Sequence, residues 1–130
     1  MIKVSKRARV GQIGETLASV FLERKGFRIL TRNYRKPWGE IDIIAEKLGI
    51  IHFVEVKALS RENISNISRE KGNYRPEEQV HPAKLQKIAK TAESFMNESN
   101  DPREFQIDVV GVFVDENSRK ARCRLFEQVL

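Results

Sequence analysis

The stretch GEIDIIAEKLGIIHFVEVK, residues 39–57, predicts the central part of a β-sheet. Apolar residues alternate with polar ones over 40–46, which is the pattern of a strand with one face on a core. After a turn at 47–49, the apolar run over 50–57 predicts a second strand. The two strands are therefore expected to pair as an antiparallel hairpin.

The flanking sequence predicts a helix on either side of this hairpin. Apolar residues at helical spacing indicate one helix over 11–26, and an apolar stripe indicates a second helix that opens at His81-Pro82. The other expected elements are strands at 27–34, 105–114 and 121–129, turns at 36–39 and 115–118, and a mobile loop at 58–80. This order predicts an α/β fold: an αβββαβ core and a last strand, with a mixed sheet flanked by helices in a single domain spanning 1–130.

Composition indicates a folded, cytoplasmic protein. The 130 residues include 24 Lys and Arg against 18 Asp and Glu, a net charge of +6, and 40% are hydrophobic. Residues 1–38 contain ten basic but only two acidic residues, so this region either attracts a nucleic acid or is an ordinary solvated surface. No apolar stretch approaches the roughly 20 residues that span a bilayer, so we expect no membrane partner. The single cysteine, Cys123, suits a reducing compartment.

The predicted hairpin also brings a chemically active set of residues together. Asp42 lies within a hydrophobic strand, where Asp is disfavoured, and the hairpin would place it beside Glu55. Neighbouring carboxylates repel each other unless a cation lies between them, so Mg²⁺ or Mn²⁺ held by Asp42, Glu55 and the Val56 carbonyl would resolve the conflict. Lys57 projects from the same face as Glu55 and would orient a water or offset charge on a phosphate. The alternative is an ordinary ion pair between Glu55 and Lys57.

These residues resemble the PD-(D/E)xK pattern of restriction-endonuclease-like nucleases. The wider sequence is similar to the YraN-type family, which itself resembles archaeal Holliday junction resolvases. Five blocks carry this similarity: Gly14-Glu15, Asn33-Tyr34-Arg35, Gly39 to Ala45, Phe53 to Lys57 and Asp108 to Val112.

The resemblance implies a restriction-endonuclease-like fold that hydrolyses phosphodiester bonds in structured or branched DNA with Mg²⁺ or Mn²⁺. It implies that Asp42 and Glu55 bind the metal and that Lys57 is the catalytic lysine. It further implies that Glu15, on the first helix, is an acidic member of the site. A homodimer is expected as well, because a junction substrate is two-fold.

Three acidic residues have alternative roles on the sequence alone. Glu15 either points toward the strands from the edge of an apolar arc or is stabilised in the first helical turn by the helix dipole. Glu40 is either an outer group of the site or a residue that only starts its strand. Asp108 either supports the site or has a structural role, capping a backbone group or pairing with a basic neighbour.

Basic residues at three places are candidates for contacting nucleic-acid phosphates. They are Arg35 and Lys36 before the first turn, Arg61 and Arg75 in the predicted loop, and Lys84 and Lys87 on the second helix. Trp38 and Tyr34, which flank the first pair, either stack on an unpaired base or pack over the turn. His52 and His81 have no spaced partner, so neither is predicted to be a metal ligand or a general base.

The sequence favours a metal-dependent endonuclease over two rivals. The first rival is a non-catalytic nucleic-acid-binding module of the same fold, and the intact set of Asp42, Glu55 and Lys57 argues against it. The second is an interaction protein in which these side chains form only an ion-pair network. The sequence has no Gly-rich phosphate loop and no nucleophile elbow, which argues against an NTPase or a serine hydrolase.

Overall fold

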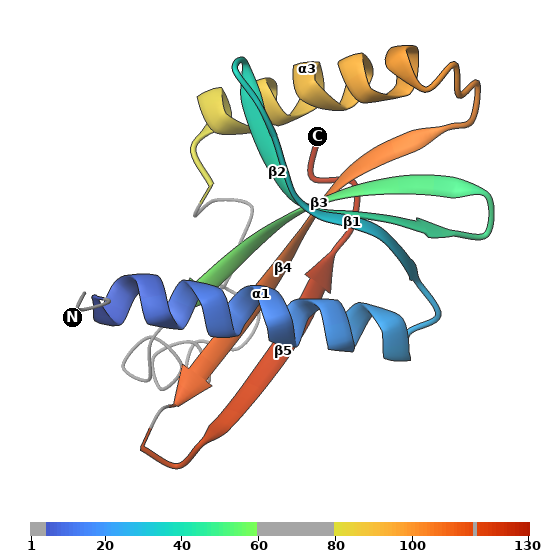
Figure 1. The fold of residues 1–130 in the computed structure, drawn as a ribbon. Helices are drawn as coiled ribbons and strands as arrows, with labels where there is room; N and C mark the ends of the chain where they lie inside the picture. The colour runs from blue at the N-terminus through green and yellow to red at the C-terminus, as the bar shows by residue number, and fades with distance from the viewer. Residues whose placement is uncertain (1–4, 60–79, 116) are drawn as a thin grey trace.

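A computed structural model describes residues 5–59, 80–115 and 117–130 of the chain. A five-stranded sheet lies between helix α1 and helix α3, with its strands in the order β1-β2-β3-β4-β5 (Figure 1). In chain order the elements are α1 (Lys6–Arg24), β1 (Arg28–Lys36), β2 (Gly39–Lys47), β3 (Ile50–Leu59), α3 (Pro82–Glu98), β4 (Phe105–Asp115) and β5 (Lys120–Phe126). This confirms the predicted α/β fold with a mixed sheet flanked by helices, and it is consistent with a restriction-endonuclease-like core.

The sheet is mixed because one of its four pairings is parallel. Strands β1, β2 and β3 form an antiparallel meander, β3 pairs with β4 in parallel, and β5 returns antiparallel to β4. The β2–β3 turn consists of Leu48 and Gly49, whose φ angles are 50° and 79°. Two successive positive φ values are typical of a type I′ turn, whose twist matches that of the flanking strands. This turn fixes the register in which β2 and β3 face each other.

Apolar side chains fill both faces of the sheet. The cluster under α3 includes Leu85, Ile88, Ala92 and Met96 with Ile44, Phe53 and Ile107. The cluster under α1 includes Ala18 and Leu22 with Ile43, Val54 and Val110. The central strands are therefore buried on both sides, whereas the alternation over 40–46 had predicted one buried face for β2. Strands covered on both faces have near-continuous apolar sequences, as in a parallel sheet.

The end of β3 differs from the sequence-based prediction. Ala58 and Leu59 pair with Val112 and Phe113 of β4, so β3 continues two residues past Lys57. The first two residues of the loop predicted at 58–80 therefore belong to β3. Residues 60–79, with the predicted phosphate contacts Arg61 and Arg75, lie outside the described residues.

Among the other elements, α1 and β5 differ most from their predicted bounds, while β1, at Arg28–Lys36, extends into the turn predicted at 36–39. Helix α1 begins at Lys6, earlier than the predicted start at residue 11, because the Ser5 hydroxyl caps it by accepting a hydrogen bond from the Ala8 backbone N–H at 3.1 Å. The last strand ends at Phe126 instead of residue 129. Beyond it the chain turns back, and the Val129 backbone N–H donates to the Ile107 carbonyl at 2.9 Å.

A buried glycine sets the distance between α1 and the sheet. A Cβ atom on Gly14 would lie only 2.7 Å from the Cβ of Ala58 on β3. The helix can cross the strand this closely only because Gly14 has no side chain. The next residue along the helix, Glu15, is thereby held beside the ends of β2 and β3.

Candidate active site

The hairpin brings Asp42 and Glu55 to the same place. Ile43 of β2 pairs with Val54 of β3, and just beyond this pair the side chains of Asp42 and Glu55 contact each other. The Val56 backbone N–H donates a hydrogen bond to Asp42 Oδ2 at 2.8 Å, which fixes the orientation of that carboxylate. Glu55 is buried, with 6% of its surface exposed. Its carboxylate is thus held in a largely apolar sheet next to a second acidic group.

A cleft of about 600 Å³ joins this pair to both helices. Its polar and charged lining comes from Lys6, Arg7 and Glu15 of α1, Asp42 of β2, Glu55 and Lys57 of β3, and Lys84 of α3. Three carboxylates and four cations from four separate elements therefore share one cavity. Val56 also lines it, as the predicted set of metal ligands requires.

Burial raises the pKa of all three carboxylates, and the charge of Asp42 adds to the shift at Glu15 and Glu55. Burial, followed by the charge of Asp42, raises the pKa of Glu55 to about 7. Burial also raises the pKa of Asp42, although the hydrogen bond from Val56 opposes the shift. The pKa of Glu15 is raised by burial and then by Asp42, while Arg32 and Arg35 act in the opposite direction. Such a group of perturbed acids in a cleft is characteristic of functional sites.

Lys84 forms an ion pair with Glu55, with 2.8 Å between its Nζ and Oε1 of the carboxylate. Burial lowers the pKa of Lys84, but the hydrogen bond and charge of Glu55 outweigh this and raise it overall. Lys84 lies in the first turn of α3, where the helix dipole disfavours a cation. Its position there is explained by the acidic pair that it faces. The sequence predicted Lys84 only as a phosphate contact, because nothing in its local pattern shows which residue of β3 it meets.

The donor set suits a hard divalent cation. One oxygen of Glu15, Oε1, is buried and has no hydrogen-bond partner among the described residues. Three carboxylates and a main-chain carbonyl offer only oxygen ligands, which Mg²⁺ and Mn²⁺ prefer. A cation there would satisfy the Glu15 oxygen and relieve the repulsion between Asp42 and Glu55. By ligand type the residues of the cleft therefore fit such an ion, although among the described residues only His52, Asp108 and Glu127 have ligand atoms that all lie within 4.8 Å of one another.

Lys57 lines the cleft and is half-buried, next to the acidic pair along β3. The ion pair recorded for Glu55 is made by Lys84, not by Lys57. The alternative of a simple Glu55–Lys57 pair is therefore not what the structure contains. With no ion pair to any residue that the structure describes, Lys57 is placed to contact a ligand in the cleft.

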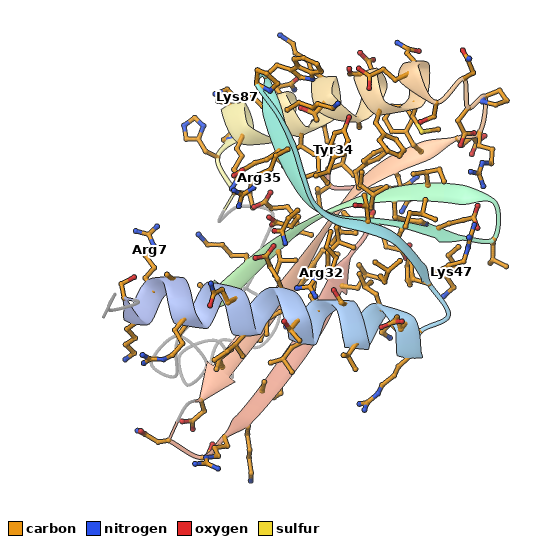
Figure 2. All side chains as sticks on the ribbon, viewed as in Figure 1. Arg7, Arg32, Tyr34, Arg35, Lys47 and Lys87 are labelled. Carbon is orange, nitrogen blue, oxygen red and sulfur yellow. The ribbon has the colours of Figure 1, made fainter. Side chains whose placement is uncertain are left out.

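Two of the other predicted nucleic-acid contacts, Arg35 and Lys87, lie on the same side of the molecule as Arg7, a residue that was not predicted from the sequence as a contact (Figure 2). Figure 2 shows Arg7 and Arg35 extending from α1 and β1 on the side where α1 begins, with Lys87 farther along on α3. The Nε atom of Arg35 lies 3.7 Å from Oε2 of Glu40. Glu40 therefore has a basic partner on the neighbouring strand and does not line the cleft with the three carboxylates.

Asp108 does not belong to this cleft. It is fully buried, and its Oδ2 lies 2.6 Å from Nδ1 of His52, itself 4% exposed. Its Oδ1 accepts hydrogen bonds from the Gln106 side chain and the Gln128 backbone N–H. Of the two roles considered from the sequence, the structural one is observed, and the basic neighbour is His52. His52 was missed as its partner because the two residues are far apart in sequence.

No described helix is both long and apolar enough to cross a membrane.

Comparison with known proteins gives a consistent family match. A family described as Uncharacterised protein family UPF0102 matches residues 14–112. A UPF0102 protein of Chloroherpeton thalassium is 39% identical over 113 residues, which cover 85% of this chain and 80% of that protein. A UPF0102 protein of Campylobacter hominis is 36% identical over 107 residues, 82% of this chain and 86% of that protein. The matched range includes all three carboxylates of the cleft.

Proposed function

We propose that this chain, which belongs to the Uncharacterised protein family UPF0102, is a metal-dependent endonuclease that hydrolyses phosphodiester bonds in structured or branched DNA. One observation carries the proposal: Glu15, Asp42 and Glu55 converge from α1, β2 and β3 in a single cleft lined by cations. Glu55 is buried and the other two acids are partly buried, and acids of like charge in such surroundings are costly to the fold unless a cation compensates them. Their retention in one cleft is what a metal site for phosphate chemistry requires.

Each residue of the cleft has a part in this proposal. Asp42, Glu55, Glu15 and the Val56 carbonyl would hold Mg²⁺ or Mn²⁺. The ion would act as a Lewis acid toward the phosphate and lower the pKa of a bound water. The Val56 N–H keeps the Asp42 carboxylate turned toward Glu55. Lys57 and Lys84, which both line the cleft, offset the negative charge that develops on the phosphate.

The surrounding charge supports a nucleic-acid substrate. Lys6 and Arg7 of α1 line the cleft, and Arg35 extends on the same side of the molecule (Figure 2). Contacts to phosphates position a nucleic acid without reading its bases, so such a site selects shape over sequence. A branched substrate, and the homodimer that would suit it, follow from the resemblance to junction resolvases and are part of the proposal.

The test is cleavage of labelled four-way-junction, flap, single-stranded and duplex DNA with Mg²⁺ or Mn²⁺. We expect wild-type protein to cut a branched substrate and expect Glu55→Gln and Asp42→Asn to lower the rate at least about 100-fold. Glu93→Gln on the exposed face of α3 is the matched control and should cleave at the wild-type rate. Equal cleavage by Glu55→Gln and wild type, or no cleavage of any substrate, would overturn the proposal.

The second candidate is a nucleic-acid-binding module without catalysis. The ion pair between Lys84 and Glu55 favours it, because an internal cation already compensates one of the acids. The same substrates separate the two candidates. Salt-dependent binding of junction DNA, with no turnover in either metal, would support the binding module.

A further inference from the structure

A second cleft, of about 540 Å³, adjoins the candidate active site. One wall is the β1–β2 turn with Trp38, and the other is the beginning of α3. Lys84 lines this cleft as well as the first one, so the two are neighbours across a single side chain. A strand of nucleic acid that reaches the carboxylates has this second cleft directly beside it.

Trp38 is the exposed aromatic group of this cleft. Half of its surface, 50%, is accessible, although tryptophan has a large apolar surface that is costly to leave in water. Tyr34, the other aromatic residue considered from the sequence, packs edge-on against Phe95 at 5.4 Å between ring centroids. The two aromatic residues therefore have different roles: Tyr34 packs against the core, and Trp38 lines the cleft.

The turn that carries Trp38 is docked firmly on α3. A Cβ on Gly39 would lie 2.2 Å from Oγ1 of Thr91, so the turn touches the helix at this point. Thr91 is fully buried, and its hydroxyl donates to the Lys87 carbonyl at 2.8 Å. The adjacent Trp38 is thus attached to a fixed backbone. An aromatic surface held in place loses little conformational entropy when a ligand stacks on it.

The charges around Trp38 define the kind of ligand. Lys36, Lys84 and Lys87 line the cleft, and the one acidic residue there, Glu40, is opposite Arg35. The first turn of α3 forms part of the wall, and a helix N-terminus favours anions. A flat apolar surface beside several cations suits a ligand that is planar and apolar at one end and anionic at the other. A nucleotide has this combination.

We propose that the second cleft, which Trp38 lines, binds an unpaired nucleotide of a DNA strand. The neighbouring phosphate of that strand enters the candidate active site. The base stacks on Trp38, and the phosphates contact Lys36 and Lys87. That this nucleotide belongs to the strand being cut rests on the proposed nuclease function. A base inside a duplex cannot present its face to a side chain, so this cleft gives the site a preference for unpaired nucleotides next to the cut.

Trp38 is the only tryptophan in the chain, so its fluorescence reports the cleft directly. With metal removed by EDTA, titration with an oligothymidylate is expected to quench the emission to a saturating level. An oligomer of the same length with abasic positions, and a blunt duplex, should quench much less. An oligouridylate serves to compare RNA with DNA at the same site.

Variants test affinity independently of fluorescence. Trp38→Ala is expected to lower the affinity for the single-stranded oligomer about 10-fold or more, and Trp38→Phe should keep most of it. Leu48→Ala is the matched control, since Leu48 is also an exposed apolar residue in a hairpin turn, with 91% of its surface accessible, and it does not line the cleft. Thermal melting of Trp38→Ala checks that the fold is retained.

The outcomes separate this inference from the nuclease proposal. Quenching and an affinity loss in Trp38→Ala, without cleavage by wild type, would keep the subsite and reject the nuclease. The subsite would be rejected, and the nuclease kept, by three results together. These are metal-dependent cleavage, Trp38 emission that does not change on addition of the oligomer, and equal affinity of Trp38→Ala and wild type. Equal quenching by the abasic oligomer would also overturn stacking as the mode of binding.

Discussion

Strand β3 carries two buried polar residues, His52 and Glu55, three positions apart, and the partners that surround them differ. His52 is 4% exposed and meets Asp108 of β4, whereas Glu55 is 6% exposed and meets Asp42 of β2. At His52 the fold supplies every partner that the neighbouring Asp108 needs. At Glu55 it places one acid beside another, with Lys84 as the cation paired to Glu55.

The two sites differ in hydrogen bonding, since His52 and Glu55 are exposed to solvent to a similarly small extent. The two oxygens of Asp108 accept from the His52 ring, the Gln106 amide and the Gln128 backbone N–H. In the cleft, by comparison, one Glu15 oxygen is buried without a partner among the described residues, and the pKa of Glu55 is raised. A buried acid with all its partners is a structural element, whereas a buried acid lacking them indicates that a ligand completes the site.

Removing the satisfied acid is expected to have the largest effect on stability. Asp108→Ala leaves the buried His52 without its acceptor and removes the acceptor of the Gln128 N–H, so the free energy of unfolding should fall by about 3–5 kcal/mol. Urea denaturation measures the loss. Asp108→Asn, which keeps one acceptor oxygen, should lose less, and Glu93→Ala on the surface should be close to wild type. An Asp108→Ala variant as stable as wild type would remove the distinction between the two sites.

Removing the repelled acid is expected to stabilise the protein. The folded-state pKa of Glu55, about 7, lies above its ordinary value of 4.5, so its contribution to stability is present below pH 4.5 and lost as pH rises through 7. Glu55→Gln has no such loss. Without metal, it should therefore be more stable than wild type by about 2–3 kcal/mol at pH 8 and about equal to it below pH 4.5.

Thermal or urea unfolding across pH 4 to 8 checks this prediction. Addition of Mg²⁺ should close the gap at pH 8, because the ion stabilises the wild-type folded state and has fewer ligands in Glu55→Gln. A Glu55→Gln protein that is less stable than wild type at pH 8 would mean that the Lys84 ion pair outweighs the repulsion from Asp42.

A smaller effect is expected where α1 crosses β3. Gly14→Ala places a methyl group 2.7 Å from the Ala58 Cβ, so the helix must move away and the free energy of unfolding should fall by about 1–2 kcal/mol. Because Glu15 moves with the helix, Mg²⁺ affinity measured by calorimetry should fall as well. The double variant Gly14→Ala/Ala58→Gly makes room for the methyl group and should recover both properties. A full loss retained in the double variant would show that this contact does not position Glu15.

Much of the fold could be predicted from the sequence because its signals are local. The alternation in β2, the turn at Leu48 and Gly49, and the apolar stripe of α3 each depend on residues close together in the chain. The same local logic placed Asp42 beside Glu55, since a short hairpin fixes its own register. The end of β3 was misjudged because Ala58 and Leu59 are held by pairing with β4, about fifty residues farther on.

The sequence by itself therefore determined the α/β fold and the pairing of two acids on neighbouring strands. Only the tertiary structure decided that Lys84 meets Glu55, that His52 meets Asp108 and that Trp38 borders the same surface as the carboxylates. The physical reason is the range of the interactions. Hairpin register follows from a few backbone angles, whereas the contacts of α1, α3 and β4 depend on how whole elements pack, down to the missing side chain of Gly14 that lets Glu15 approach the sheet.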